Sequence, residues 1–334
     1  MTRFGFTLSN RGIITGATTV PEMLHLAERV DRDLVWDSVW VGDSIFAKPR
    51  LDAISLLAAV AVKTERVRLG PACFASTPLR GALLLAYQWA SLDFMSGGRT
   101  IFVACQGAQG GGHGAFEQEF AAFGVDPKTR MKRMEEAIEV LRLTSAREDA
   151  SYEGTYVRFE HLTILPRPVQ KPIPIWVTAN PDVFETEAPD PKRLPGAERA
   201  LRRVARLGDG WMTTLNTPES FRRQLERIRG YAREIGRELG PGFEACLYYN
   251  INVNDDREAA MEESRRYLTA YYGMPYSREL LERWVAFGSV ADCVAKLRAF
   301  VAAGATTITL RLTSYDQERQ YRRVTGEVLP ALLA

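Results

Sequence analysis

The sequence predicts an α/β protein that folds as one (β/α)8 barrel. Short apolar segments alternate with amphipathic segments along the whole chain, and eight of the apolar segments have the length of a strand. The chain has 334 residues, enough for a barrel of about 250 residues with insertions. A doubly wound sheet, the alternative, would carry the motif GxGxxG after its first strand, and the turn Ser9-Asn-Arg-Gly12 lacks it.

The eight predicted strands are apolar segments bounded by turn residues. They are residues 3–8, 38–42, 67–74, 101–104, 173–178, 210–214, 244–253 and 306–312. The third strand contains Pro71, which has no N–H to donate to a neighbouring strand. We therefore expect irregular backbone between Pro71 and Phe74. A separate small hairpin is predicted from Tyr152 to Phe159, with its turn at Glu153-Gly154.

Helices are predicted between these strands, several of them with a recognisable first turn. Thr19-Val-Pro-Glu22 has the form of a capping box, and Asp126-Pro127 and Thr217-Pro218 each combine an N-cap residue with proline. Ser289 to Asp292 is a fourth such start. The predicted helices begin near residues 19, 51, 81, 126, 197, 217, 255 and 289, and a last helix closes the chain.

Residues 180–196 interrupt this alternation of strands and helices. The segment is acidic and irregular, and it contains prolines at positions 181, 189, 191 and 195. Loops of this length inside a compact domain tend to be lids or disordered segments. We expect a single domain over residues 1–334, with 180–196 as an insertion or lid loop after the fifth strand.

Composition excludes several classes of function. Lys plus Arg (43) nearly balances Asp plus Glu (41), so the net charge of +2 gives no electrostatic case for nucleic acid or an anionic membrane. The longest apolar run, 54–62, is far shorter than a membrane span, and the first residues do not resemble a signal peptide, so we expect a cytoplasmic protein. Four cysteines without a CxxC motif indicate neither a disulfide framework nor a zinc site, and no metal is expected.

The stretch from Ser91 to Gly107 organises the predicted site. Its strand opens at Cys105 and Gln106 into a glycine-rich loop, 107–114, which we interpret as the floor of a pocket. In a (β/α)8 barrel the reactive groups lie at the carboxyl ends of the strands. These ends carry few strong acids or bases and no paired carboxylates, which favours a protein that relies on a cofactor. The residues there are Phe6, Thr7, Asp43, Ser44, Cys73, Phe74, Cys105, Gln106, 178–180, 212–214, Asn252 and Arg311.

Six segments resemble the bacterial luciferase-like flavin-dependent oxidoreductases, in the order that this family has them. The segments are WDSVWVGDS (36–44), RVRLGPACFASTPLR (66–80), SLDFMSGGR (91–99), KTRMKRMEEAIEVLR (128–142), PRPVQKPIPIWV (166–177) and RLGDGW (206–211). The resemblance implies a (β/α)8 barrel that binds reduced FMN, or the deazaflavin coenzyme F420, at the barrel mouth. It also implies a homodimer.

The same resemblance assigns cofactor-binding residues. Arg130 stands where the family places an arginine near the flavin phosphate, a role that suits a guanidinium. Ala72 and Cys73 occupy the position of a non-prolyl cis peptide behind the flavin ring. Thr178, Ala179 and Asn180 stand where the family binds phosphate or ring oxygens, although Pro181 departs from the usual pattern. Asp43 and Gln106 complete the predicted cofactor contacts.

Three residues are candidates for catalysis. Ser44 replaces the histidine that many family members carry after the second strand, and Gln106 and Ala108 stand where a basic or acidic residue is common. Ser44 and Gln106 could still donate hydrogen bonds to the flavin or to an oxygen species. His113, in the glycine loop, is placed to act as acid, base or substrate anchor, whereas His25 and His161 are expected to be peripheral.

The favoured hypothesis is a two-component monooxygenase that oxidises a small organic substrate with reduced FMN, supplied by a separate flavin reductase, and O₂. One alternative is hydride transfer with coenzyme F420, and another is a flavin-binding barrel without catalysis. Aromatic residues suggest an apolar or aromatic substrate, although rings at such positions are more often core. The residues assigned to the substrate are Phe6, Trp40, Phe74 and Trp211.

Overall fold

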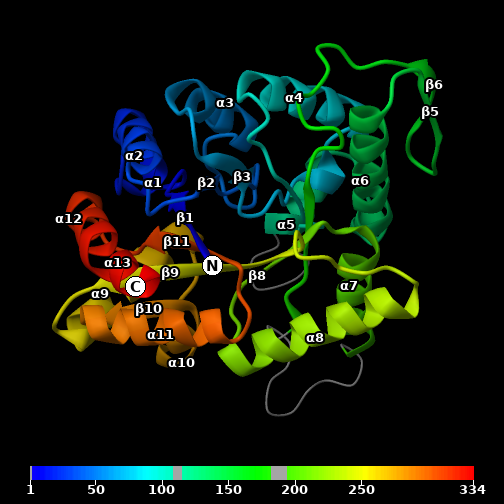
Figure 1. Cartoon of the computed structure of the whole chain (residues 1–334). Coiled ribbons are helices and arrows are strands. Elements are labelled where there is room, and N and C mark those ends of the chain that lie inside the picture. Colours follow the sequence, from blue (N-terminus) through cyan, green and yellow to red (C-terminus); the bar gives the residue numbers. More distant parts are fainter. Residues whose placement is uncertain (1, 108–114, 182–193) are drawn as a thin grey trace.

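Eight parallel strands form a nearly closed barrel that helices surround (Figure 1). The computed structural model describes residues 2–107, 115–181 and 194–334. Around the barrel the strands follow the order β3-β2-β1-β11-β9-β8-β7-β4, and two single bridges, Leu69–Thr100 and Phe74–Ala104, join β4 to β3. The predicted barrel is therefore confirmed, and the doubly wound alternative is wrong. The barrel strands are β1 (Arg3–Leu8), β2 (Ser38–Val41), β3 (Arg68–Pro71), β4 (Phe102–Ala104), β7 (Ile175–Thr178), β8 (Gly210–Thr213), β9 (Glu244–Val253) and β11 (Thr307–Leu312).

The predicted helix starts are confirmed by their caps. Thr19 and Thr217 each accept a hydrogen bond from a backbone N–H in the first turn of their helix, and Ser289 forms a capping box with Asp292. The helices are α1 (Gly12–Thr15), α2 (Val20–Arg32), α3 (Ala53–Lys63), α4 (Ala82–Met95), α5 (Ala115–Ala122), α6 (Arg130–Ala146), α7 (Leu194–Leu207), α8 (Pro218–Glu234), α9 (Arg257–Tyr272), α10 (Arg278–Trp284), α11 (Val290–Ala302), α12 (Gln317–Arg323) and α13 (Leu329–Leu333), with short turns η1 (Thr77–Leu79), η2 (Pro127–Thr129) and η4 (Val324–Val328). None of the helices in the described ranges is long and apolar enough to span a bilayer.

Apart from short turns such as α1 and η1, three elements appear in the described residues that the sequence analysis did not predict. They are α5, α10 and a short strand, β10 (Val285–Gly288), which pairs with the second half of β9. The predicted hairpin is present as β5 (Ala150–Glu153) and β6 (Arg158–Leu162), and it lies outside the barrel beside α6 (Figure 1). Buried Glu136 of α6 holds its turn by accepting the N–H groups of Thr155 and Tyr156 at 2.7 and 2.8 Å.

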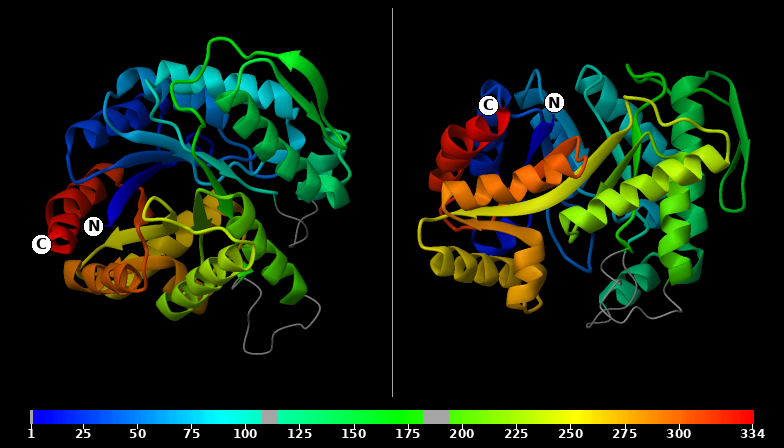
Figure 2. Two further views of the ribbon diagram at one scale, coloured as in Figure 1. Left: turned by 45° about the vertical axis from the view of Figure 1, so that its right-hand side comes forward. Right: turned by 60° about the horizontal axis from the view of Figure 1, so that its bottom comes forward.

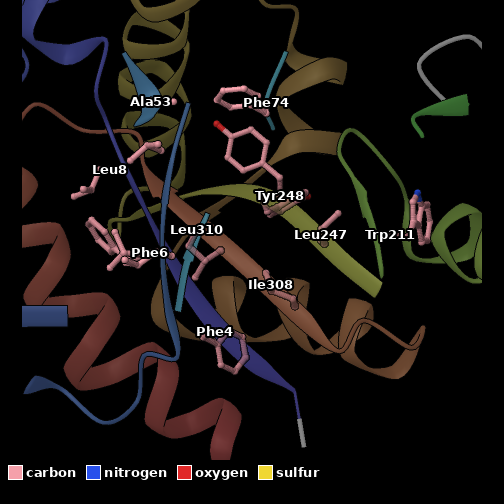
Figure 3. Packing of buried hydrophobic residues seen from close by; sticks show 14 of the residues in the cluster. Phe4, Phe6, Leu8, Ala53, Phe74, Trp211, Leu247, Tyr248, Ile308 and Leu310 are labelled. Atoms are coloured by element: carbon pink, nitrogen blue, oxygen red, sulfur yellow. The ribbon is translucent and has the colours of Figure 1, made fainter. Parts of the chain in front are cut away.

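Alternate residues of each strand face the barrel interior or the helices. Phe4, Phe6 and Leu8 of β1 pack in the core between the barrel and its helices (Figure 3). Thr7 lies between them in sequence and faces inward, where its hydroxyl meets that of Thr309 at 2.6 Å. The last helices, α12 and α13, lie beside β1 and close this side of the barrel (Figure 2).

Two tryptophans fill the middle of the barrel. The rings of Trp40 (β2) and Trp176 (β7) lie 5.2 Å apart, and both side chains are almost completely buried. Glycines make room for them, since a Cβ atom on Gly70 would lie 2.7 Å from the Trp40 ring and one on Gly210 would lie 2.5 Å from the Trp176 ring. The remaining members of this inner cluster are Ile101, Val103, Met212 and Cys246. The barrel is therefore a packed core and not a pore.

The amino-terminal end of the barrel, where the strands begin, carries paired charges. Arg68 contacts Asp37 at 2.6 Å and Glu244 at 2.7 Å, and Arg3 contacts Glu244 at 2.8 Å. A cavity of about 360 Å³ lies at this end. Its polar lining is part of the same ion-pair and hydrogen-bond network, which at this end of a barrel indicates a structural role. The charged lining residues are Arg68, Arg99, Arg142, Asp209 and Glu244.

Candidate functional site

The carboxyl ends of β3, β4 and β7 bring Cys73, Cys105 and Thr178 together. The peptide bond between Ala72 and Cys73 is cis, as the resemblance predicts. The Cys73 thiol donates a hydrogen bond to Cys105, and this bond, together with burial, raises the pKa of Cys73. Thr178 also hydrogen-bonds to Cys105. These small, uncharged groups form one side of the interior at the end of the barrel where a cofactor is expected.

Asp43, predicted to contact the cofactor, is bound to the loop that follows the cis peptide. Its carboxylate accepts the N–H of Ser76 at 2.7 Å and lies 3.9 Å from Arg80. Burial raises the pKa of Asp43, while Ser76 and Arg80 act in the opposite direction. The structure thus gives Asp43 a part in holding the residues directly after Cys73.

The three residues predicted for catalysis differ in what the structure shows. The Oγ of Ser44 accepts the N–H of Lys48 at 3.0 Å, which leaves its hydrogen available to a ligand. Gln106 follows Cys105, and its Oε1 atom is buried without a hydrogen-bond partner in the described part of the chain. Buried acceptors are normally satisfied, so Gln106 fits an N–H donor from a bound molecule. His113 and Ala108 lie outside the described residues.

Arg130, predicted to bind phosphate, lies at the first turn of α6 next to a second arginine, Arg203 of α7. Arg130 donates to the carbonyl of Pro127 at 2.7 Å, and its Nε is buried without a partner among the described residues. The Nη1 of Arg203 is also buried without a partner among the described residues, while its Nε contacts Glu135 at 2.7 Å. Burial and the nearby charge of Arg203 both lower the pKa of Arg130. Two guanidiniums with free N–H groups at a helix N-terminus suit a phosphate.

The residues after β7 have divided roles. Thr178 faces the interior, whereas Ala179 packs in the core outside the barrel, and its carbonyl accepts the indole N–H of Trp211 at 3.0 Å. Asn180 accepts the N–H of Thr214 at 3.0 Å, which ties the end of β7 to the end of β8. Residues 182–193, most of the predicted insertion, lie outside the described residues.

The four aromatic residues predicted for the substrate are almost completely buried. Phe6 packs against Trp36, Phe74 against Trp89 and Trp211 against Phe221, with ring centroids 5.4, 5.8 and 4.9 Å apart. Each of these three rings lies between the barrel and a helix, and Trp40 fills the barrel interior. Contact with a substrate would require the core to open. Phe6, Phe74 and Trp211 face the helices because neighbouring residues near the end of a strand point to opposite faces of the sheet.

The sequence analysis did not predict a second group of side chains at this end of the barrel. In this group four cations surround three tyrosines. Arg311 lies near the end of β11 and Tyr248 in the middle of β9, and the others come from the loops after β1 and β2 and from the end of α9. We call this group the cation–tyrosine cluster; it consists of Arg11, Lys48, Arg50, Arg311, Tyr248, Tyr271 and Tyr272. A signal was present in the sequence, since Arg311 is the one charged residue of its strand, TITLRL.

Comparison with known proteins identifies a family and relatives that match most of the chain. The profile of the luciferase-like monooxygenase family matches residues 1–184 and 195–307, so the match is interrupted within the predicted insertion. The F420-dependent glucose-6-phosphate dehydrogenase of Kineococcus radiotolerans is 24% identical over 323 residues, which cover 89% of this chain and 88% of the relative.

Two solved structures share the barrel over almost the whole chain. The monooxygenase RslO1 from Streptomyces bottropensis superposes with a TM-score of 0.77 at 24% identity and covers 98% of this chain and 99% of its own. An F420-dependent secondary alcohol dehydrogenase, solved in complex with an F420–acetone adduct, has a TM-score of 0.78 at 17% identity and covers 99% of both chains. At these identities the structures show a common fold.

Proposed function

The chain belongs to the luciferase-like monooxygenase family and is an oxidoreductase, and from this premise we propose that it transfers hydride between coenzyme F420 and a small organic substrate. The observation that carries the proposal is the alignment with F420-dependent glucose-6-phosphate dehydrogenases, which extends over 89% of the chain. These relatives favour F420 over FMN, although the sequence analysis gave FMN first place.

The residues present fit a planar cofactor with a phosphate group. Among the buried polar atoms that lack partners in the described ranges, three belong to residues placed for the cofactor or next to them, namely Oε1 of Gln106, Nε of Arg130 and Nη1 of Arg203. We assign the phosphate to Arg130 and Arg203, and an N–H of the ring to Gln106. Ala72 and Cys73 would flank the ring, with Asp43 holding the loop behind them.

The bound cofactor would supply the hydride chemistry, and the chain would supply binding, orientation and proton movement. The half-buried residues Cys73 and Cys105 would limit the access of water to one side of the site. The Ser44 hydroxyl can donate a hydrogen bond to the substrate. For the proton released or taken up by the substrate we propose His113, which lies in the glycine loop.

Cofactor titration tests the proposal. The purified protein is titrated with F420, with FMN and with the deazaflavin FO, which lacks the phosphate, and the cofactor fluorescence is followed. We expect F420 to bind most tightly and Arg130→Gln to weaken F420 binding about tenfold without affecting FO. If neither F420 nor FMN binds, the proposal is wrong. Tight binding without turnover on any alcohol would favour the non-catalytic alternative.

FMN-dependent monooxygenation is the second candidate. Ala108 favours it, because an acid at this position is common in deazaflavin-dependent sugar-phosphate dehydrogenases. This candidate requires a separate flavin reductase. Oxygen consumption with such a reductase, NADH and FMN would support it, and FMN binding tighter than F420 binding would give it first place. The homodimer implied by the resemblance is tested by light scattering on the purified protein.

A further inference from the structure

The cation–tyrosine cluster holds four positive charges close together. Lys48 Nζ lies 4.9 Å from the centroid of the Tyr272 ring, and the guanidinium of Arg311 lies 4.2 Å from that of Tyr271. The guanidinium of Arg50 contacts the same Tyr271 ring at 5.7 Å. The charges also act on one another, since burial and the neighbouring Arg50 lower the pKa of Arg11. Two tyrosine rings therefore connect cations that repel one another.

Carboxylates do not neutralise this group. In the ranges that the structure describes, no Asp or Glu lies within ion-pair distance of Arg11, Lys48, Arg50 or Arg311. The two buried carboxylates nearby are bound elsewhere. Asp43 accepts the N–H of Ser76, and Glu119 accepts the N–H groups of residues 45 and 46. Asp43 still acts on Arg50 at longer range.

Several donors in the cluster have no partner among the residues that the structure describes. Arg311 is only 1% exposed, and its Nε makes no hydrogen bond to these residues, although its Nη1 donates to the Tyr272 hydroxyl at 2.6 Å. The Nε and Nη1 atoms of Arg11 are also buried without partners in the described part of the chain. Unsatisfied buried donors on a guanidinium are costly, and each such donor fits an oxygen acceptor from a bound molecule.

Neighbouring residues define the positions of Arg50 and of two tyrosines in the cluster. A Cβ atom on Gly42, at the end of β2, would lie 2.1 Å from Nη1 of Arg50, so Arg50 can occupy its place only because residue 42 is glycine. Asn10 binds both the N–H and the carbonyl of Gly42, at 3.1 and 2.8 Å. Tyr272 is held by the hydroxyl of Tyr248 at 3.0 Å. Arg50 and the tyrosines therefore have defined places in the cluster.

We propose that the cation–tyrosine cluster binds the anionic group, a carboxylate or a phosphate, of the substrate. This inference rests on the proposed function. The cluster draws its residues from β9, from the end of β11, from α9 and from the loops after β1 and β2, whereas Cys73, Gln106 and Arg130 follow β3 and β4. The two groups therefore belong to different parts of the barrel rim. One serves the substrate, and the other serves the ring and phosphate of the cofactor.

The experiment compares charged and neutral probes of one shape. Benzoate, phenyl phosphate and neutral benzamide are titrated calorimetrically into the protein, with and without saturating F420. We expect benzoate or phenyl phosphate to bind and benzamide to bind at least about tenfold more weakly. Arg50→Gln and Lys48→Met should each weaken anion binding about tenfold, and Lys63→Met, which removes an exposed cation on α3, should leave it unchanged. Gly42→Ala, which displaces Arg50 without removing charge, should also weaken it.

Each outcome decides the proposal. Equal binding of benzoate and benzamide, no binding of either anion, or equal anion binding by Arg50→Gln and Lys63→Met would overturn it. If F420 abolishes benzoate binding, the cluster serves the acidic tail of the cofactor, and the assignment to the substrate is wrong. F420 fluorescence titrations of the same variants separate this test from the proposed function, because we expect Arg50→Gln to bind F420 as the unchanged protein does.

Discussion

Both ends of the barrel carry buried or half-buried arginines, but the partners of these charges differ. At the amino-terminal end Arg68 is shared between Asp37 and Glu244, and Arg142 contacts Asp209 at 2.9 Å. At the other end the cations of the cation–tyrosine cluster lie on tyrosine rings, without ion pairs among the described residues. A cation paired inside the fold contributes to stability, and one without such a partner is available to a ligand.

This difference predicts that removing a charged group changes the free energy of unfolding in opposite directions at the two ends. Breaking a buried pair leaves its partner uncompensated, whereas removing one of several repelling cations relieves repulsion. Three measurements test this contrast, in order of decreasing expected effect.

The largest effect is expected for Glu244→Gln. Glu244 binds Arg3, Arg68 and the hydroxyl of Thr307, and although burial opposes it, Arg68 lowers the pKa of Glu244. The variant should lose about 3 kcal/mol in the free energy of unfolding, measured by urea denaturation. Glu28→Gln, which removes a carboxylate paired with Lys63 on the surface, is the control and should lose less than about 1 kcal/mol. Equal losses of unfolding free energy in the two variants would show that the buried ion pair stabilises the protein no more than the surface pair does.

A smaller effect of opposite sign is expected for Lys48→Met. The change removes a half-buried cation that lies near Arg11 and Arg50. The free energy of unfolding should stay the same or rise, by up to about 1 kcal/mol, because the neighbouring arginines lose a like charge. Urea denaturation at pH 7 measures it. A loss comparable to that of Glu244→Gln would show that both ends of the barrel depend on their cations for stability.

The smallest effect concerns pH. Burial, with Arg50 and Arg11, lowers the pKa of Lys48 to about 8. An unfolded chain holds this proton up to a pH of about 10.4, so between these values the unfolded state binds more protons and stability rises with pH. Benzoate affinity should fall by about fivefold as the pH rises from 7 to 9, because Lys48 loses most of a charge that is expected to contribute about tenfold. In Lys48→Met, neither the rise in stability nor the fall in benzoate affinity with pH should occur. If both persist in this variant, another group titrates.

Local patterns in the sequence predicted most of the fold. The strands and capped helices follow from residue spacing and from single turns such as Thr19-Val-Pro-Glu22, which need no information from distant residues. The segment from α10 to β10 was missed, because β10 forms only by pairing with the end of β9. Its seven-residue helix also has too few turns to show a clear period.

The candidate site was less predictable. Pro71 pointed to irregular backbone, and the resemblance placed the cis peptide at Ala72–Cys73, where the structure has it. Phe6, Phe74 and Trp211 were chosen because they stand near strand ends, but a shift of one residue decides which face a side chain occupies. The cation–tyrosine cluster joins residues up to 300 positions apart, from Arg11 to Arg311, and spacing along the chain carries no signal of such an assembly.

The tryptophan pair in the middle of the barrel has a consequence for both ends. Trp40 and Trp176, with their glycine neighbours, form an apolar partition that neither water nor ions cross easily. Water and ions therefore reach each end separately. Substitutions that retune the binding end for a different compound can accumulate there, while the ion pairs on the other side of the partition continue to hold the scaffold together.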